Sequence, residues 1–225
     1  MTSAFITATG TDIGKTHITC ALLAHLAETG VSSTMIKPLM SGFSDDDLAA
    51  SDAGRLLAAM GRDVDEAGVN ALCMARFEAP LAPNVAARAA GKAYEYDDIL
   101  AFVNARGLSA DGPVLVEGAG GVMSPVTDEK LHADLISDLA MPAFLVTANY
   151  LGGISHTLSA LEVMNARAIP VLGVIVSQPT KDHGAPDTII KELSYWVKTP
   201  MLAAPFGSPE TLKTVGAKMA RLMGV

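Results

Sequence analysis

Short apolar segments alternate with helix-like segments along almost the whole chain, and this alternation constrains the fold more than any other feature of the sequence. The candidate strands are rich in β-branched and aliphatic residues and span 4–9, 33–38, 113–118, 143–148, 171–177 and, with a weaker pattern, 200–205. The candidate helices span 15–29, 47–60, 95–106, 132–140, 155–167, 185–197 and 209–223. Strands that are apolar on both faces need helices on both sides. The sequence therefore predicts an α/β fold with a doubly wound, mostly parallel sheet and right-handed crossovers.

Length and patterning favour a single domain over residues 1–225. The chain is 50% hydrophobic, which is enough for one sizeable core, and it has no long linker or break in composition. The least regular segment is 62–94, where "EAPLAPN" (78–84) holds two prolines. Proline at that density excludes a continuous helix or a central strand, so we expect a surface excursion there. Residues 178–187 have the composition of a loop that leads into the next helix.

Charge and cysteine content limit which classes of partner and which cellular compartment we expect. The formal net charge of -8 would repel the phosphates of nucleic acid and of membranes, so we expect neither as a partner and favour small molecules. The two cysteines, Cys20 and Cys73, lie far apart and lack the spacing of a disulfide framework or a zinc site. No basic leader and no apolar run of about 18 residues is present. These features predict a cytoplasmic protein.

The stretch "ITATGTDIGKTHITCALL" (6–23) predicts a phosphate site. A Gly-rich turn between a strand and a helix offers backbone N–H groups and the helix dipole to an anion. The Lys of Gly14-Lys15-Thr16 then reaches the β- and γ-phosphates, and the Thr hydroxyl reaches Mg²⁺. The full G-x-x-x-x-G-K-T pattern fails by one residue, because position 9 is Thr and the glycine falls at position 10.

Two further strand ends carry groups that suit a nucleoside triphosphate. Glu117 stands where the apolar run 114–116 ends and is followed by a Gly-Ala-Gly-Gly turn. Ligands of open α/β sheets lie at the carboxyl ends of strands. We therefore expect Glu117 to converge with the loop 9–16 as a metal-holding carboxylate. The strand end "MIKPLMSG" (35–42) carries Lys37 and Ser41. A Lys there could neutralise charge that develops during phosphoryl transfer, or could simply be solvated. Asp45, Asp46, Asp47 and Asp52 come next, and any one of them could be a second metal ligand.

Taken in order, "TGTDIGKT", "KPLMSG" and "VEGAGG" resemble the dethiobiotin synthetase family. The similarity continues through "SDA" (51–53), "FEAPLAPNVAAR" (77–88) and "LGGISHTLSALE" (151–162), so that it covers most of residues 4–177. The resemblance implies a P-loop NTPase-type fold and a homodimer. It also implies an enzyme that uses ATP and Mg²⁺ to close the ureido ring of dethiobiotin from 7,8-diaminopelargonic acid and CO2. In that chemistry a carbamate of one amine attacks the γ-phosphate, and the second amine then displaces phosphate.

The resemblance also assigns roles by position. It implies catalytic roles for Lys15, Lys37 and Thr11, and a metal site formed by Thr16, Asp52 and Glu117. The implied nucleotide-binding residues are Gly10, Thr11, Asp12, Ile13, Gly14, Lys15, Thr16, His17, Glu117, Gly118, Gly120 and Ser177. The implied substrate-binding residues are Lys37, Ser41, Gly118, Ala119, Gly120, Gly121 and Ser155. No histidine nucleophile is required, so His17, His25, His132, His156 and His183 default to structural roles.

The chain departs from the family pattern at three places. Ala8 and Gly10 stand where the family has Gly and Asp, so the loop is expected to differ locally. Ser155 replaces an Asn that helps to hold the substrate carboxylate from the neighbouring subunit. Ser177 replaces an Asn that reads adenine, and a hydroxyl cannot supply the paired donor and acceptor of an amide. We therefore expect nucleotides other than ATP to compete well.

Alternatives remain open at this stage. A ParA/MinD-like ATPase switch places a second Lys within the loop, where this chain has Gly10. An amidoligase such as cobyrinic acid diamide synthase carries a glutaminase domain for which this chain is too short. A nucleotide-binding regulatory module would not need Lys37, Ser41 and Asp52. The apolar helix at 158–164 could contribute to a subunit interface or face the core.

Overall fold

A six-stranded parallel sheet forms the centre of the computed structural model, which describes residues 2–44 and 46–225. The strand order is β2-β5-β1-β6-β7-β8, and each neighbouring pair is parallel. The strands are β1 (Ser3–Ala8), β2 (Thr34–Ile36), β5 (Val114–Glu117), β6 (Ala143–Ala148), β7 (Val171–Ser177) and β8 (Met201–Ala204). All six predicted strands are therefore present in the predicted kind of sheet.

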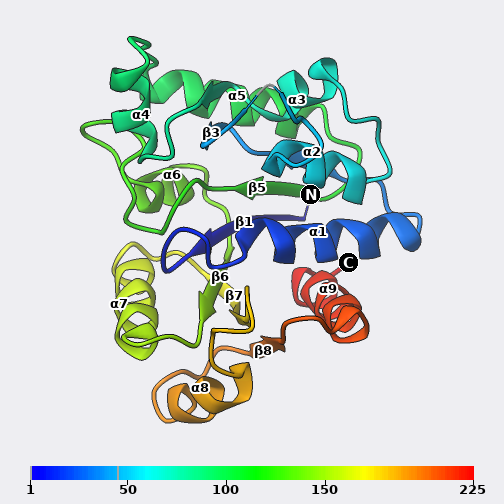
Figure 1. The fold of residues 1–225 in the computed structure, drawn as a ribbon, viewed down its shortest axis with the longest axis vertical. Helices are drawn as coiled ribbons and strands as arrows, with labels where there is room; N and C mark the ends of the chain where they lie inside the picture. Colours follow the sequence, from blue (N-terminus) through cyan, green and yellow to red (C-terminus); the bar gives the residue numbers. More distant parts are fainter. Residues whose placement is uncertain (1, 45) are drawn as a thin grey trace.

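Helices cover both faces of this sheet, as a doubly wound fold requires (Figure 1). One face is covered by α1 (Lys15–Glu28), α2 (Asp52–Ala59), α3 (Glu66–Leu72) and α9 (Pro209–Met223). The opposite face is covered by α5 (Tyr96–Leu108), α6 (His132–Asp138), α7 (Gly153–Ala166) and α8 (Pro186–Leu193). The helix α4 (Pro83–Ala89) packs apart from these on a small second sheet.

Alternation along the strands divides the interior into two cores. In β1, Ile6 packs with the α1 face and Phe5 with the opposite face, and both are fully buried. The same alternation places Phe144 and Leu145 of β6 in different cores. Successive side chains of a strand point to opposite sides, so an apolar run without polar interruptions fills both layers. This arrangement brings the ends of β1, β2, β5 and β7 to the same edge of the sheet.

The segment 62–94 adds no strand to the central sheet and forms no continuous helix, as expected, but it is more ordered than a surface excursion suggests. It contains α3, α4 and the strand β4 (Ala75–Phe77), which pairs in parallel with β3 (Leu39–Ser41). Val69 and Phe77 are buried. Pro83 does not break α4, because it lies in the first turn, where the missing N–H has no intrahelical partner in any case.

The start of one helix differs from the expectation. Helix α2 begins at Asp52 instead of 47, because the Ser51 hydroxyl accepts a hydrogen bond from the Gly54 N–H and caps the helix there. The segment 158–164 of α7 packs on the core through Ala160 and Met164. Its part in a subunit interface stays a prediction.

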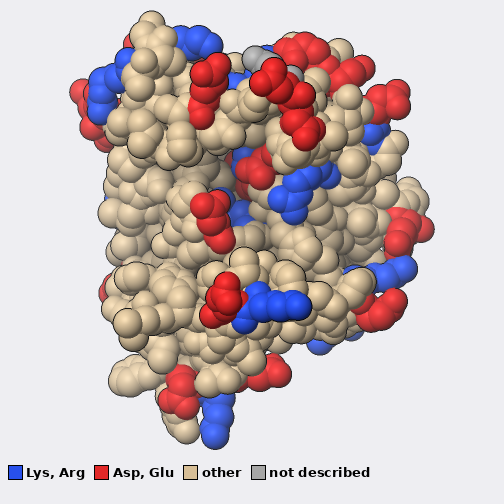
Figure 2. Space-filling model, in the orientation of Figure 1, with Lys and Arg blue, Asp and Glu red and all other residues tan. Residues whose placement is uncertain are grey.

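Charged side chains of both signs are spread over the surface (Figure 2). Acidic and basic side chains are interspersed on the face drawn in Figure 2, and both kinds surround a hollow near its centre. Within residues 2–44 and 46–225, no helix is long and apolar enough to cross a bilayer. Asp45, one of the acids considered as a metal ligand, lies outside the described residues.

Candidate active site

The turn from β1 into α1 has the backbone of a phosphate-binding loop. Gly14 has φ 95°, and a Cβ at this position would lie 2.6 Å from the Ser177 Oγ, so only glycine fits. Helix α1 begins directly after it, and its first N–H groups face the space above the loop. The Lys15 ammonium folds back over the loop and donates to the Gly10 carbonyl at 3.1 Å. Burial, and then the charge of Lys37, lower the pKa of Lys15 to about 8.

Glu117 lies at the end of β5 and joins three elements. Its side chain is fully buried. Its Oε1 accepts from the Thr16 hydroxyl at 2.7 Å, and its Oε2 accepts from the Thr19 hydroxyl at 2.5 Å. The Lys37 ammonium donates to Oε1 at 2.6 Å. The predicted convergence of Glu117 with the loop 9–16 is thus present in the structure.

Lys37 lies between two carboxylates. Its ammonium is 2.6 Å from Glu117 Oε1 and 2.9 Å from Asp52 Oδ2, and its side chain is 3% exposed. Burial disfavours the charged amine, but the two carboxylates outweigh burial and raise the pKa of Lys37 above its usual value. Burial disfavours the charged form of Asp52 and would raise its pKa, but Lys37 and the Thr16 hydroxyl lower that pKa overall. A buried Lys with two carboxylate partners is not the solvated surface Lys that the sequence left open.

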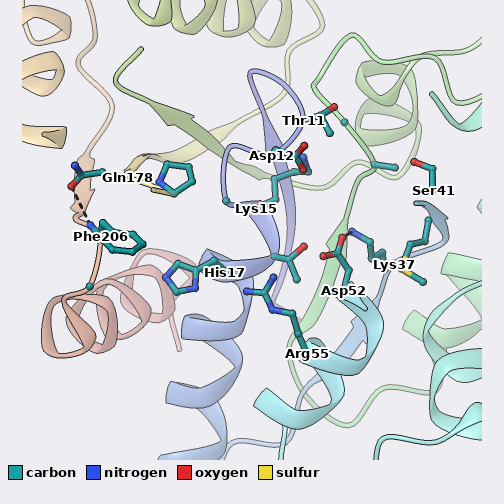
Figure 3. A pocket seen from close by; sticks show the side chains of 17 residues that line it. Thr11, Asp12, Lys15, His17, Lys37, Ser41, Asp52, Arg55, Gln178 and Phe206 are labelled. Atoms are coloured by element: carbon teal, nitrogen blue, oxygen red, sulfur yellow. Dashed lines mark hydrogen bonds and ion pairs between the residues drawn. The ribbon is translucent and has the colours of Figure 1, made fainter. Parts of the chain in front are cut away.

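A pocket of about 560 Å³ opens over these groups. Figure 3 shows Lys37, Asp52 and Ser41 at one end of it and Gln178 and Phe206 at the other. The phosphate loop lies between the two ends. Residues that line the pocket are Thr11, Asp12, Gly14, Lys15, Thr16, His17, Lys37, Met40, Ser41, Asp52, Arg55, Ala119, Gly120, Gln178, Pro179, Phe206 and Gly207. An elongated pocket with cations at one end and an aromatic ring at the other suits a nucleotide.

The glycine turn after Glu117 is held by a buried histidine. The Ala119 N–H donates to His132 Nε2 at 3.0 Å, while His132 Nδ1 lies 3.0 Å from the Ser124 carbonyl oxygen. This pair of contacts requires a neutral ring with its proton on Nδ1. Burial lowers the pKa of His132 to about 4, in agreement with that neutral form. His132 thus positions the turn that lines the pocket.

Other predicted site residues lie at the margin of the pocket or away from it. Ile13 is buried in the core, and Gly118 and Gly121 flank the lining residues Ala119 and Gly120 without lining the pocket themselves. Ser177 is 1% exposed, and its neighbours Gln178 and Pro179 line the pocket instead.

A second group of predicted residues lies outside this pocket. Ser155, at the start of α7, lines a separate depression with Leu151 and Ile154. Asp46 and Asp47 are exposed and do not line the pocket. Of the acids considered as metal ligands within the described residues, Asp52 alone joins this group, because it pairs with the Lys37 ammonium that also contacts Glu117.

Sequence reasoning missed several lining residues. Arg55 on α2, Gln178 after β7 and Phe206 after β8 belong to no short motif, and they meet only in the folded chain. Thr19 was missed although it follows Lys15 by one helical turn, a spacing that could have placed it on the same face of α1.

Comparison with known proteins identifies the family of this chain. A family model described as an AAA domain matches residues 2–204. An ATP-dependent dethiobiotin synthetase of Phenylobacterium zucineum is 41% identical over 91% of this chain and 89% of its own. The corresponding protein of Caulobacter sp. is 40% identical over 92% and 89%, and that of Acidiphilium cryptum is 41% identical over 79% and 80%. The chain belongs to the dethiobiotin synthetase family.

Proposed function

We propose that this protein is an ATP-dependent dethiobiotin synthase, a ligase of biotin biosynthesis that forms two C–N bonds of the ureido ring from 7,8-diaminopelargonic acid and CO2. The observation that carries the proposal is the position of Lys37, whose buried ammonium lies between Glu117 and Asp52 beside a phosphate-binding loop. The family membership is consistent with it. A ParA/MinD-like switch is not favoured, because relatives similar over most of the chain are named dethiobiotin synthetases.

The donor set near Lys37 fits Mg²⁺. Thr16, Asp52 and Glu117 offer one hydroxyl and two carboxylates, and no group of three or more His, Cys, Asp or Glu side chains suited to a metal occurs in the described parts of the chain. Mg²⁺ is typically held by one or two carboxylates together with substrate phosphates and waters. When bound, the ion would neutralise charge on the β- and γ-phosphates.

Lys37 and Lys15 would then act on the transferred phosphoryl group. One amine of the diamine adds to CO2 and loses a proton, which gives a carbamate. A carbamate oxygen attacks the γ-phosphorus, the bond to ADP breaks, and a carbamic-phosphoric anhydride forms. The second amine attacks the carbamoyl carbon, loses a proton and releases phosphate. Two buried cations near the transferred group stabilise the negative charge of the phosphoryl-transfer step better than solvated ones would.

A second depression continues the nucleotide pocket and suits the diamine. It has a volume of about 600 Å³ and shares Thr11, Ser41, Asp52 and Gly120 with the first pocket. Pro80, Leu81 and Pro83 form its outer wall. Its apolar wall would contact the aliphatic chain, while Thr11 and Ser41 would lie beside the carbamate.

We further propose a homodimer in a reducing cytoplasm. Ser155 lies beside two exposed apolar residues, Leu151 and Ile154, and a partner subunit would cover them and bring Ser155 to the tail of its neighbour's substrate. Cys20 and Cys73 are both free thiols, as that compartment would keep them.

Incubation with diaminopelargonic acid, bicarbonate, Mg²⁺ and ATP tests the proposal. We expect dethiobiotin, identified by mass, in equal amount to the ADP formed. Phosphate release without dethiobiotin would point to another ATPase. No turnover at all would point to a nucleotide-binding module, and either result would overturn the proposed function.

A further inference from the structure

Arg55 lies at the wall of the nucleotide pocket, and within the described residues its side chain forms no ion pair. It lies on α2, one turn after Asp52, and lines the pocket. Figure 3 shows its guanidinium between the side chains of His17 and Asp52. The residue is exposed, and within the described parts of the chain its guanidinium makes no hydrogen bond or ion pair. A guanidinium has five N–H donors, and here none of them is used by the protein.

The backbone of Arg55, in contrast, is firmly placed. Its N–H donates to the Ser51 carbonyl at 3.0 Å. Its carbonyl accepts from the Cys20 thiol at 3.5 Å, which ties α2 to α1. The next two residues, Leu56 and Leu57, are buried in the core. The helix therefore fixes where the side chain starts, and the side chain is free to meet whatever enters the pocket.

Its surroundings favour an anion. Lys15 and Lys37 line the same pocket together with Asp12 and Asp52. Lys37 is already paired with Asp52 and Glu117, so within the described residues Lys15 and Arg55 are the lining cations that form no ion pair with a carboxylate. After the effect of burial, the charge of Arg55 also contributes to the lowered pKa of His17, which shows that the two side chains are close. An unpaired guanidinium beside other cations gains most from a ligand with several negative oxygens, and its planar fork matches two oxygens of a phosphate.

The position along the pocket decides which phosphate it meets. Lys37, Asp52 and Ser41 mark the end where the transferred γ-phosphate would lie, and Gln178 and Phe206 mark the base end (Figure 3). Arg55 and His17 lie between these ends. We propose that Arg55 binds the α- and β-phosphates of the nucleotide, the part that stays on the leaving ADP. The inference rests on the proposed function only in that the ligand is a nucleotide.

This role has a consequence for product binding. A residue that contacts only the transferred γ-phosphate would lose its contact once ADP forms. A residue on the α- and β-phosphates would hold ADP as well as ATP. Arg55 should therefore strengthen the binding of both nucleotides by a similar factor.

Calorimetric titration of Arg55→Gln with Mg²⁺-ATP and with Mg²⁺-ADP, without diamine or bicarbonate, tests the inference. We expect the dissociation constants of both nucleotides to rise by about tenfold, the effect of losing one charge-assisted contact. Arg55→Lys, which keeps the charge and loses the fork, should lie between wild type and Arg55→Gln. The melting temperature without nucleotide should not change, because the guanidinium has no partner to lose.

Arg62→Gln is the matched control. Arg62 follows the same helix and is exposed, and it donates to the Ser33 carbonyl outside the pocket. Arg62→Gln removes the same charge as Arg55→Gln and should leave nucleotide binding unchanged. Unchanged binding in Arg55→Gln, a loss confined to ATP, or an equal loss in Arg62→Gln would each overturn the inference. None of these measurements needs dethiobiotin to form, so a failure of the proposed reaction would be seen separately.

Discussion

The ammonium of Lys37 lies 2.6 Å from Oε1 of Glu117, and the Thr16 hydroxyl reaches the same oxygen at 2.7 Å. Residues from the ends of β2 and β5 and from the start of α1 thus share one buried carboxylate oxygen. Asp52 completes the group from α2. The cluster links the phosphate loop to the side of the pocket where the substrate would lie, so its charges decide the behaviour of the site.

Removing the Lys37 charge should separate turnover from nucleotide binding. We expect Lys37→Ala to lower kcat by about 10²-fold or more, because a buried cation aimed at the transferred group is lost. Affinity for Mg²⁺-ATP should change little, since the loop and Lys15 remain. Steady-state kinetics and calorimetry check the two parts. Lys130→Ala is the control, because Lys130 pairs with Asp138 on the surface. A near wild-type rate would remove Lys37 from the mechanism.

The Lys15 ammonium should make nucleotide capture sensitive to alkaline pH. Its pKa in the free protein is lowered to about 8, so the amine is charged below that pH and neutral above it. Only the charged form attracts phosphate, so kcat/KM for ATP should fall as the pH rises through about 8. A pH profile of kcat/KM reports ionisations of the free enzyme. A flat profile from pH 7 to 9.5 would contradict the lowered pKa.

His132 should make the fold sensitive to mild acid. The pKa of His132 is lowered from 6.5 to about 4 by burial, so between these values the unfolded chain binds a proton that the folded chain does not. The free energy of unfolding should fall by up to about 3 kcal/mol as the pH drops from 6.5 to 4, with no such term above pH 7.

Urea unfolding at several pH values, compared with His132→Gln, isolates this term. A Gln amide can still accept the Ala119 N–H but does not titrate. The variant should lose this part of the pH dependence, and an identical slope in both proteins would show that His132 is not its source.

Base selectivity should be low. Ser177 is 1% exposed, and its hydroxyl lies beside Gly14 with no hydrogen-bond partner among the residues that the structure describes. The Gln178 amide is already engaged, because it donates to the His183 carbonyl at 2.7 Å and accepts from the Phe206 N–H at 3.1 Å. The Ser177 hydroxyl is buried and does not line the pocket, and the Gln178 amide is already engaged, so neither side chain is placed to read adenine. Calorimetric competition with ATP, CTP and GTP should give dissociation constants within about one power of ten, roughly 1.4 kcal/mol. A strict ATP preference would show that backbone groups or other side chains read the base.

Local sequence patterns were sufficient to predict the central sheet of the fold. Apolar runs at the six strands were sufficient to predict the doubly wound sheet, because a strand buried on both faces admits few other surroundings. The short helices and the strand of 62–94 were not predicted, because the prolines were considered only as helix breakers, whereas Pro83 in the first turn is compatible with the start of α4. The pairing of β3 with β4 could not be predicted from sequence, because these two short strands are far apart in the chain and meet only after the segment between them has folded.

The part of the site that follows directly after strands could be predicted from the sequence. Lys15, Thr16 and Glu117 follow from motif and topology, because parallel strands end at one edge of the sheet. That Lys37 lies between Glu117 and Asp52 follows only from how α2 packs on α1. Arg55 and Phe206 line the pocket because distant segments pack together, and no sequence motif predicts their position in the site.

The fate of the oxygen atoms of CO2 shows whether ring closure proceeds through a phosphorylated carbamate. In the proposed reaction, a carbamate oxygen becomes the bridge to phosphorus and leaves with phosphate at ring closure. Turnover with freshly added 18O-labelled bicarbonate, diaminopelargonic acid and ATP should therefore yield dethiobiotin together with phosphate that carries one 18O atom, measured by mass spectrometry. Dethiobiotin formed with unlabelled phosphate would contradict the account.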